Sequence, residues 1–351
     1  MLPHSTTENA AFERTPLADA HGYAPLARAY PRCGGAAQLC SVSRHMILAH
    51  IEKHFPSEHP RTVAVRQHLA SACVEFVDRG LADPKFVSEL ASGSNQKFWA
   101  CVSEALVADR LRDKNFGARE TRGKGPDFLV MAGSRRVWIE VVCPEPVHVS
   151  ANWLNPQSGG VVNFPHEEIL LRWTSAIKAK AEALIGSADG KQEGYLNSGV
   201  VAPDDAYVIA VNGCQLRRGP FPALVGISQF PFAAEAVFPI GPYQLRIDRE
   251  TLKVVERGHQ HRPYVLNKNG AKVPANTFLD PRFNPVSAIW AVDLNGGSAI
   301  GNSEPTAVVH NPNATNPVPL GFLPADDEYV GVAEGDELVL SKTGTQNASD
   351  G

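Results

Sequence analysis

Three acidic residues lie in apolar surroundings in the first half of the sequence. Glu104 lies within FWACVSEALVADRL, Asp127 begins the apolar run PDFLVM, and Glu140 lies inside VWIEVV. A buried charge is costly unless it has a partner, so three acids placed in this way call for a shared cation. Two or three carboxylate oxygens, completed by water and a phosphate oxygen, are ligands that Mg²⁺ accepts. The sequence therefore predicts a site for Mg²⁺ or Mn²⁺ built from Glu104, Asp127 and Glu140.

The spacing of Asp127 and Glu140 predicts that the two side chains lie close together. They belong to two short apolar runs joined by AGS, a pattern typical of a β-hairpin. Residues separated in this way across a tight turn lie on adjacent antiparallel strands. The structural alternative is that Asp127 only starts a strand and that Glu140 forms a salt bridge with Arg135 or Arg136.

The elements that would carry these acids follow from the periodicity of apolar residues. Spacings of three and four predict helices, and short apolar runs bounded by turn residues predict strands. We expect helices over 40–55, 60–81, 84–91, 95–113 and 166–185, and strands near 117–121, 126–131, 135–142 and 205–213. The order over 95–213 is then helix, three strands, helix and strand, which is an α/β core.

The second half of the sequence is predicted to be rich in β-structure. Turn residues separate EAVFPIG, YQLRID, LKVVER, RPYVLN, VSAIWAVDL and PTAVVHN, which favours a meander or a second sheet beside or continuing the first. The predicted organisation is a disordered start (1–40), a helical N-terminal part (41–94), the α/β core (95–215), a β-rich C-terminal extension packed on the core (216–341) and a disordered tail (342–351).

These motifs resemble the PD-(D/E)XK, or restriction-endonuclease-like, superfamily of nucleases, whose core is αβββαβ. The segments GPDF, VWIEVVCPEP, EEILLRWTSAIKAKAEAL and VVHNPNATNPVPLGF resemble uncharacterised bacterial proteins of that superfamily, and the likeness covers about 85–330. The resemblance implies a restriction-endonuclease-like core and Mg²⁺-dependent hydrolysis of phosphodiester bonds in nucleic acid, most simply DNA. In this superfamily the carboxylates bind the metal, and a lysine two residues after the glutamate assists the reaction.

Val142 occupies the position of that lysine, so the positive charge must come from elsewhere if the site is active. At about 100° per residue, Lys180 falls roughly 35° to 40° from the centre of the apolar stripe of the helix 166–185. Lys178 points away by the same arithmetic. We expect Lys180, with Arg172 on the same face, to supply the missing charge. The alternative is that Lys180 pairs with Glu140 or Asp127 without chemistry.

A basic segment just before Asp127 is a candidate for binding the phosphate backbone. Arg122 and Lys124 follow four other Lys and Arg residues within DRLRDKNFGARETRGKGPD, and such segments can bind the backbone of nucleic acid. Acidic residues are interspersed, so the segment is also compatible with an ordinary solvated surface.

The composition bounds these hypotheses. A formal net charge of −4 gives no global attraction to nucleic acid, so binding would need a local patch. No apolar run is long enough to cross a membrane and the N-terminus lacks a signal-peptide pattern, so we expect a cytoplasmic protein without a membrane partner. The six cysteines are irregularly spaced, which favours free thiols.

Two alternatives to a nuclease remain open at this point. A nuclease-like fold can keep its acids for structure and act as a module that binds nucleic acid or protein. A carboxylate-pair hydrolase acting on sugars would need exposed aromatic residues in a cleft, whereas Trp138 and Trp173 are predicted to be buried.

Overall fold

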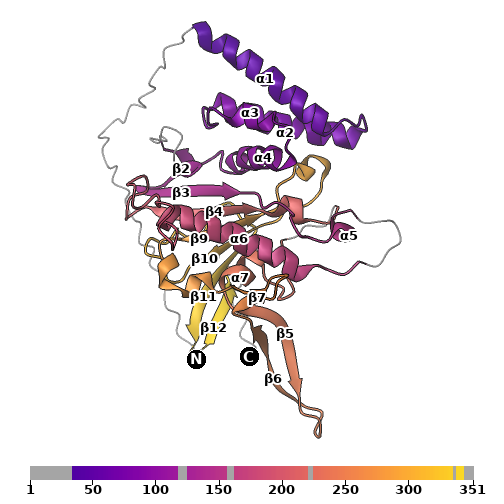
Figure 1. Cartoon of the computed structure of the whole chain (residues 1–351), viewed down its shortest axis with the longest axis vertical. Helices are drawn as coiled ribbons and strands as arrows, with labels where there is room; N and C mark the ends of the chain where they lie inside the picture. Colours follow the sequence, from indigo (N-terminus) through magenta and orange to yellow (C-terminus); the bar gives the residue numbers. More distant parts are fainter. Residues whose placement is uncertain (1–33, 118–124, 156–161, 220–223, 335–336, 344–351) are drawn as a thin grey trace, which may run out of the picture.

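A mixed eight-stranded β-sheet organises the described part of the chain, which comprises residues 34–117, 125–155, 162–219, 224–334 and 337–343 of the computed structural model (Figure 1). Its strands are, in spatial order, β1 (Asn115–Phe116), β2 (Phe128–Ala132), β3 (Arg135–Val142), β4 (Ala206–Asn212), β9 (Ala288–Val292), β10 (Thr306–His310), β11 (Asp327–Glu334) and β12 (Glu337–Lys342). The first three strands form an antiparallel meander, and β3, β4 and β9 run parallel to one another.

Helices cover both faces of this sheet. One face carries α1 (Gly34–His54), α2 (Pro60–Asp78), α3 (Phe86–Leu90) and α4 (Asn95–Arg110), which lie above β2 and β3 in Figure 1. The other face carries α6 (His166–Ile185) and the short α7 (Phe232–Val237). Successive strand residues point to opposite faces. In β3, Trp138 therefore packs with the α6 core, whereas Val137 and Ile139 pack with the α4 core.

The chain between β4 and β9 forms smaller elements outside the large sheet. The hairpin of β5 (Ile240–Ile247) and β6 (Val254–His261) projects from the body in Figure 1, and β7 (Tyr264–Leu266) pairs with β8 (Lys272–Pro274). The short helices are α5 (Ala151–Leu154), η1 (Gly213–Leu216), η2 (Thr277–Leu279), η3 (Pro281–Phe283) and η4 (Gly297–Ile300). No helix in the described ranges is long and apolar enough to span a membrane.

The prediction of a mixed α/β fold is confirmed, and so are the main helices and the β2–β3 hairpin. The predicted strand at 117–121 is replaced by β1 at 115–116, and 118–124 lie outside the described residues. Helix α1 begins at Gly34, so 34–40 are helical rather than disordered, and the alanines of GGAAQLC favour a helix there. The C-terminal strands β9 to β12 continue the core sheet, which is one of the arrangements that the sequence favoured for this half.

Two errors in the second half have physical reasons. The segment EAVFPIG was predicted as a strand, but its first three residues belong to the helix α7. That helix, FAAEAV, is rich in alanine and buried all round, which removes any period-two signal. The strand β11, DEYVGVAE, was not predicted, because its charged and small residues obscure the apolar alternation.

Candidate active site

The β2–β3 hairpin brings Asp127 and Glu140 to the same end of the sheet. The strands pair Phe128 with Ile139, and extending this register by one residue sets Asp127 against Glu140. By the alternation of side chains along a strand, both acids point to the same face as Leu129 and Trp138, which pack under α6. The backbone N–H of Val141 donates to Asp127 Oδ2 at 2.7 Å, which fixes the aspartate against the next strand. The predicted proximity of the two acids therefore follows from the register.

Lys180 reaches this pair from α6. Its Nζ lies 2.6 Å from Glu140 Oε1, and the side chains are 27% and 5% exposed. The Tyr207 hydroxyl donates to the Lys180 carbonyl at 3.3 Å, which ties this turn of the helix to β4. Burial opposes the charge on Lys180, but the carboxylates of Glu140 and then Asp127 raise its pKa above the ordinary value. Lys180 is therefore a cation at neutral pH, held against Glu140.

The sequence also allowed a salt bridge of Glu140 with Arg135 or Arg136, but both arginines have other partners. Arg135 donates to the Pro317 carbonyl at 2.5 Å, and Arg136 lies 3.5 Å from Asp205. The salt bridge of Glu140 with Lys180 joins β3 to α6, across the interface between the sheet and its covering helix.

Glu104 lies on α4, on the helical layer opposite α6, and is partly buried. Burial raises its pKa well above the ordinary value, and the carboxylate of Asp127 raises it further, with Lys180 opposing. The pKa of Glu104 thus depends on the charges of Asp127, Glu140 and Lys180. Within the described ranges, however, no three or more His, Cys, Asp and Glu side chains are grouped so that they could hold a metal ion. The structure brings Asp127, Glu140 and Lys180 together and leaves Glu104 as a neighbour.

Arg172 lies on α6 eight residues before Lys180, and its Nε donates to the Glu145 carbonyl at 2.7 Å. This bond holds the chain that leaves β3. Of the other predicted substrate-binding residues, Arg122 and Lys124 lie outside the described residues.

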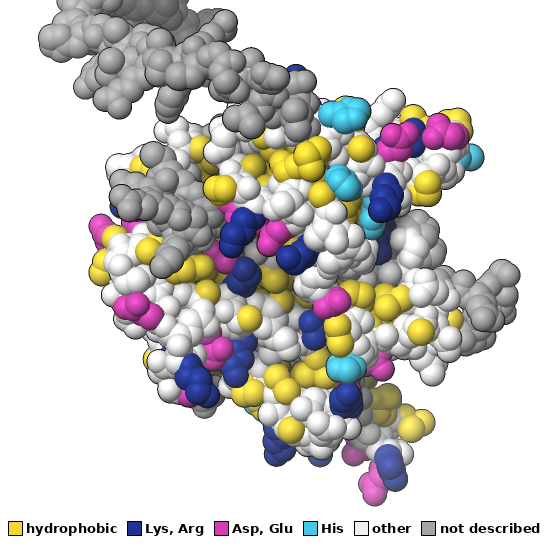
Figure 2. Space-filling view, turned by 45° about the horizontal axis from the view of Figure 1, so that its top comes forward, with side chains coloured by type: hydrophobic (Ala, Val, Ile, Leu, Met, Phe, Trp, Pro, Cys, Tyr) yellow, Lys and Arg dark blue, Asp and Glu magenta, His cyan; other side chains and the backbone are white. Residues whose placement is uncertain are grey.

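The described part of the basic segment is engaged with the protein itself. Arg110 forms an ion pair with Glu304 at 3.1 Å, Arg112 pairs with Asp109, and the Lys114 ammonium lies over an aromatic ring. On the face seen in Figure 2, Lys and Arg side chains are interspersed with Asp and Glu. These observations favour a solvated surface for the described portion of the segment.

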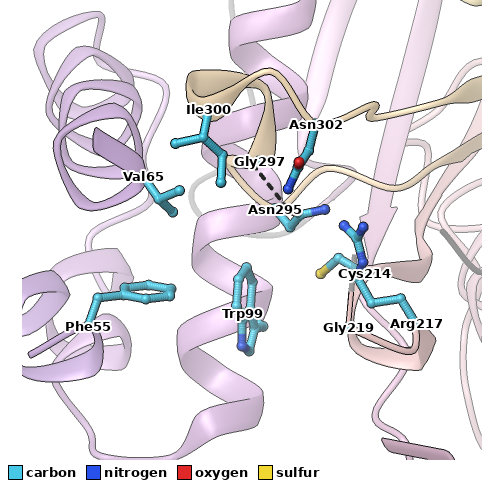
Figure 3. A pocket seen from close by; sticks show the side chains of 10 residues that line it. All are labelled: Phe55, Val65, Trp99, Cys214, Arg217, Gly219, Asn295, Gly297, Ile300 and Asn302. Carbon is cyan, nitrogen blue, oxygen red and sulfur yellow. Dashed lines mark hydrogen bonds between the residues drawn. The ribbon is translucent and has the colours of Figure 1, made fainter. Parts of the chain in front are cut away.

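A pocket that the sequence did not indicate lies at the carboxyl ends of β4 and β9 (Figure 3). Its volume is ≈ 330 Å³. Aromatic rings, small apolar groups, amides and one guanidinium line it: Phe55, Val65, Trp99, Cys214, Arg217, Gly219, Asn295, Gly297, Ile300 and Asn302. The carboxyl ends of neighbouring parallel strands are a common place for ligands in α/β sheets. Its walls come from Phe55 just after α1, from α2 and α4, and from η1, η4 and the residues beside them. These segments are too far apart in the sequence for any local motif to reveal the pocket.

Comparison of the chain with protein-family models, with curated proteins and with solved structures finds no match in any of the three. The assignment of a function therefore rests on the geometry of the chain itself.

Proposed function

We propose that the chain is a Mg²⁺-dependent nuclease that hydrolyses phosphodiester bonds, most simply those of DNA, at Asp127, Glu140 and Lys180. The observation that carries this proposal is the 2.6 Å contact between Lys180 Nζ and Glu140 Oε1, beside Asp127. Two carboxylates and one lysine at the end of a hairpin are the groups of the PD-(D/E)XK motif. Here the lysine comes from α6 rather than from the strand.

The order and pairing of the elements support the same proposal. Helix α4 is followed by the antiparallel meander β1–β2–β3, then by α6, and then by β4, which is parallel to β3. This is the αβββαβ arrangement that the sequence resemblance implies. We therefore assign the part of the sheet from β1 to β4, with α4 and α6, to a restriction-endonuclease-like core.

The residues present fit a hard divalent cation. Mg²⁺ is usually held by one or two carboxylates together with water and substrate phosphate oxygens, and Asp127 and Glu140 are such a pair. When bound, the ion would neutralise phosphate charge and lower the pKa of a bound water. The Val141 N–H orients Asp127. The Lys180 ammonium, kept charged by its carboxylate neighbours, offsets negative charge that develops on the phosphate oxygens.

Glu104 has a different part in this proposal. Its raised pKa means that it holds a proton more readily than an ordinary glutamate. A divalent cation at Asp127 and Glu140 would reverse this effect, because positive charge favours the ionised carboxylate. Glu104 would then serve as an additional acid that ionises when the metal binds.

One observation favours a second candidate, a binding module without catalysis. The salt bridge between Lys180 and Glu140 joins α6 to β3, so both residues also have a structural reason to be present. In that case the same surface would bind nucleic acid or protein, and added metal would change nothing.

Cleavage assays on the full chain separate these candidates. We would incubate labelled single- and double-stranded DNA with the protein and Mg²⁺, Mn²⁺ or EDTA, and compare Asp127→Asn, Glu140→Gln and Lys180→Met. Lys178→Met is the matched control, because Lys178 is on the same helix, 60% exposed, and 3.9 Å from Glu182. Thermal unfolding of each variant shows whether it is folded.

A nuclease should lose metal-dependent cleavage in the three site variants and keep it in Lys178→Met. Mn²⁺ binding, followed by calorimetry, should be lost in Asp127→Asn. Cleavage that persists in folded Asp127→Asn, or that EDTA does not stop, would exclude this site. DNA binding without cleavage at any metal concentration would favour the binding module.

A further inference from the structure

Two cysteines meet at the edge of the sheet where β3 and β4 end. Cys143 directly follows β3, and Cys214 lies in η1, directly after β4. Because β3 and β4 are parallel neighbours, their carboxyl ends are adjacent. The two sulfur atoms lie 3.7 Å apart, and both side chains are buried. A disulfide bond is about 2.05 Å long, so the sulfurs would have to approach by roughly 1.6 Å to form one.

The surroundings of Cys143 favour a thiolate. The Gln215 side-chain amide donates to Cys143 Sγ at 3.4 Å, and this amide is itself held by Asn95 at 3.0 Å. The hydrogen bond from the Cys214 thiol lowers the pKa of Cys143 below its ordinary value against the opposing effect of burial, and bonds from Ser103 and Gln215 add to the lowering. Thiolates are the nucleophiles of thiol–disulfide exchange.

Cys214 is the member of the pair that a small molecule in the pocket could reach. It lines the pocket of ≈ 330 Å³, and Figure 3 shows its side chain at the wall beside Arg217 and across from Trp99. That volume lies at the lower end of the range for small-molecule sites. Burial raises the pKa of Cys214, so its proton must be removed before it can react, and the Cys143 thiolate is the adjacent acceptor.

We propose that Cys143 and Cys214 form a thiol–disulfide exchange site that reacts with low-molecular-weight disulfides entering this pocket. Cys214 transfers its proton to Cys143, and its sulfur attacks one sulfur of the incoming disulfide. That disulfide bond breaks, one half leaves as a thiolate, and the thiolate takes up the proton from Cys143. The Cys143 thiolate then attacks Cys214 Sγ, which forms the Cys143–Cys214 disulfide and releases the second half, protonated by solvent.

The reaction balances without a further reactant. Two protein thiols are oxidised by two electrons in total, and the small disulfide is reduced to two thiols. Cys73 and Cys101 differ from this pair because neither lines the pocket; burial also raises the pKa of each thiol, to about 12 for Cys73. The inference does not depend on the proposed nuclease activity.

The test uses the full chain with Cys33→Ser and Cys40→Ser, so that Cys73, Cys101, Cys143 and Cys214 remain. The reduced protein is incubated with bis(2-hydroxyethyl) disulfide and analysed by intact mass and by peptide mapping under non-reducing conditions. We expect loss of two hydrogens and a peptide link between Cys143 and Cys214. Cys73→Ser, the matched control, should give the same link at the same rate.

Single variants test the order of events. Cys143→Ser should stop at a mixed disulfide on Cys214 that forms at least tenfold more slowly than the link in the parent, because the proton acceptor is gone. Cys214→Ser should leave Cys143 unmodified, because Cys143 does not line the pocket. Thermal unfolding before and after the reaction checks that the fold is kept. The proposal is overturned if the folded parent forms no Cys143–Cys214 link, if the link appears only in denaturant, or if Cys143 in folded Cys214→Ser reacts as fast as Cys214 does in folded Cys143→Ser.

Discussion

Replacing Lys180 by methionine tests the salt bridge at the centre of the site. Methionine keeps most of the aliphatic stem but removes the ammonium that lies 2.6 Å from Glu140 Oε1. Breaking a buried ion pair by removing one partner costs about 3–5 kcal/mol. Lys180 is 27% exposed, so solvent screens part of this loss. We expect the free energy of unfolding to fall by about 2–3 kcal/mol.

The double variant Glu140→Gln with Lys180→Met separates the charge effect from packing. Replacing both members of a buried pair is often close to neutral, so we expect the double variant to lie within about 1 kcal/mol of the parent. If Glu140→Gln alone also costs about 2–3 kcal/mol, the coupling energy from the double-mutant cycle should be at least about 3 kcal/mol. Lys178→Met, at an exposed position on the same helix, should change stability by less than about 0.5 kcal/mol.

Urea unfolding followed by tryptophan fluorescence measures these differences, because Trp138, Trp173 and Trp290 are buried and report on the core. A fall of less than about 1 kcal/mol in the free energy of unfolding of Lys180→Met would refute the reasoning, because breaking an ion pair buried to this extent should cost more. Losses in the double variant equal to the sum of the two single losses would also refute it, because they would indicate no coupling.

Three further predictions concern the surroundings of the site and the fold. The pKa of Glu104 is raised in the folded state, so its contribution to stability is complete below the unfolded value near 4.5 and is lost as pH rises through the folded value. Between pH 4.5 and 8, the melting temperature of Glu104→Gln should therefore rise relative to that of the parent. A difference in melting temperature that stays constant with pH would contradict this. A Cβ at Gly226 would lie 2.3 Å from Glu235 Oε1, so Gly226→Ala should cost about 1–3 kcal/mol in urea unfolding, and an unchanged midpoint would show that the close approach is absent. Burial lowers the pKa of His310 against the opposing charge of Glu328, so its contribution is present above pH 6.5 and is lost as pH falls; thermal unfolding of His310→Gln should be less sensitive to acid between pH 7 and 5 than that of the parent, and equal sensitivity would count against it.

The parts of this protein that could be predicted from sequence are those that depend on local patterns. The β2–β3 hairpin follows from two apolar runs and one tight turn, and its register sets Asp127 against Glu140. The period of α6 predicts that Lys180 faces the sheet, and Lys180 contacts Glu140, one of the two partners that the alternative without chemistry named for it. Each of these inferences uses residues within one or two adjacent elements.

The parts that could not be predicted depend on pairing between distant segments. Cys143 and Cys214 are brought together only because β3 and β4 are neighbours across the intervening α6. The pocket gathers side chains from Phe55 to Asn302. For Glu104, apolar surroundings in the sequence predicted a cation shared with Asp127 and Glu140. They could not indicate how far helix α4 lies from the hairpin.

The parallel pairing of β4 with β9 has a consequence for how the chain folds. Residues 213–287 separate these adjacent strands, and closing a loop of this length costs about 4 kcal/mol of chain entropy beyond a constant. The β2–β3 hairpin closes over two residues, so we expect it to form earlier than this central seam. The acid pair would then be set early in folding, whereas the pocket, whose walls include η1 and η4 on either side of the seam, would appear only when the seam closes.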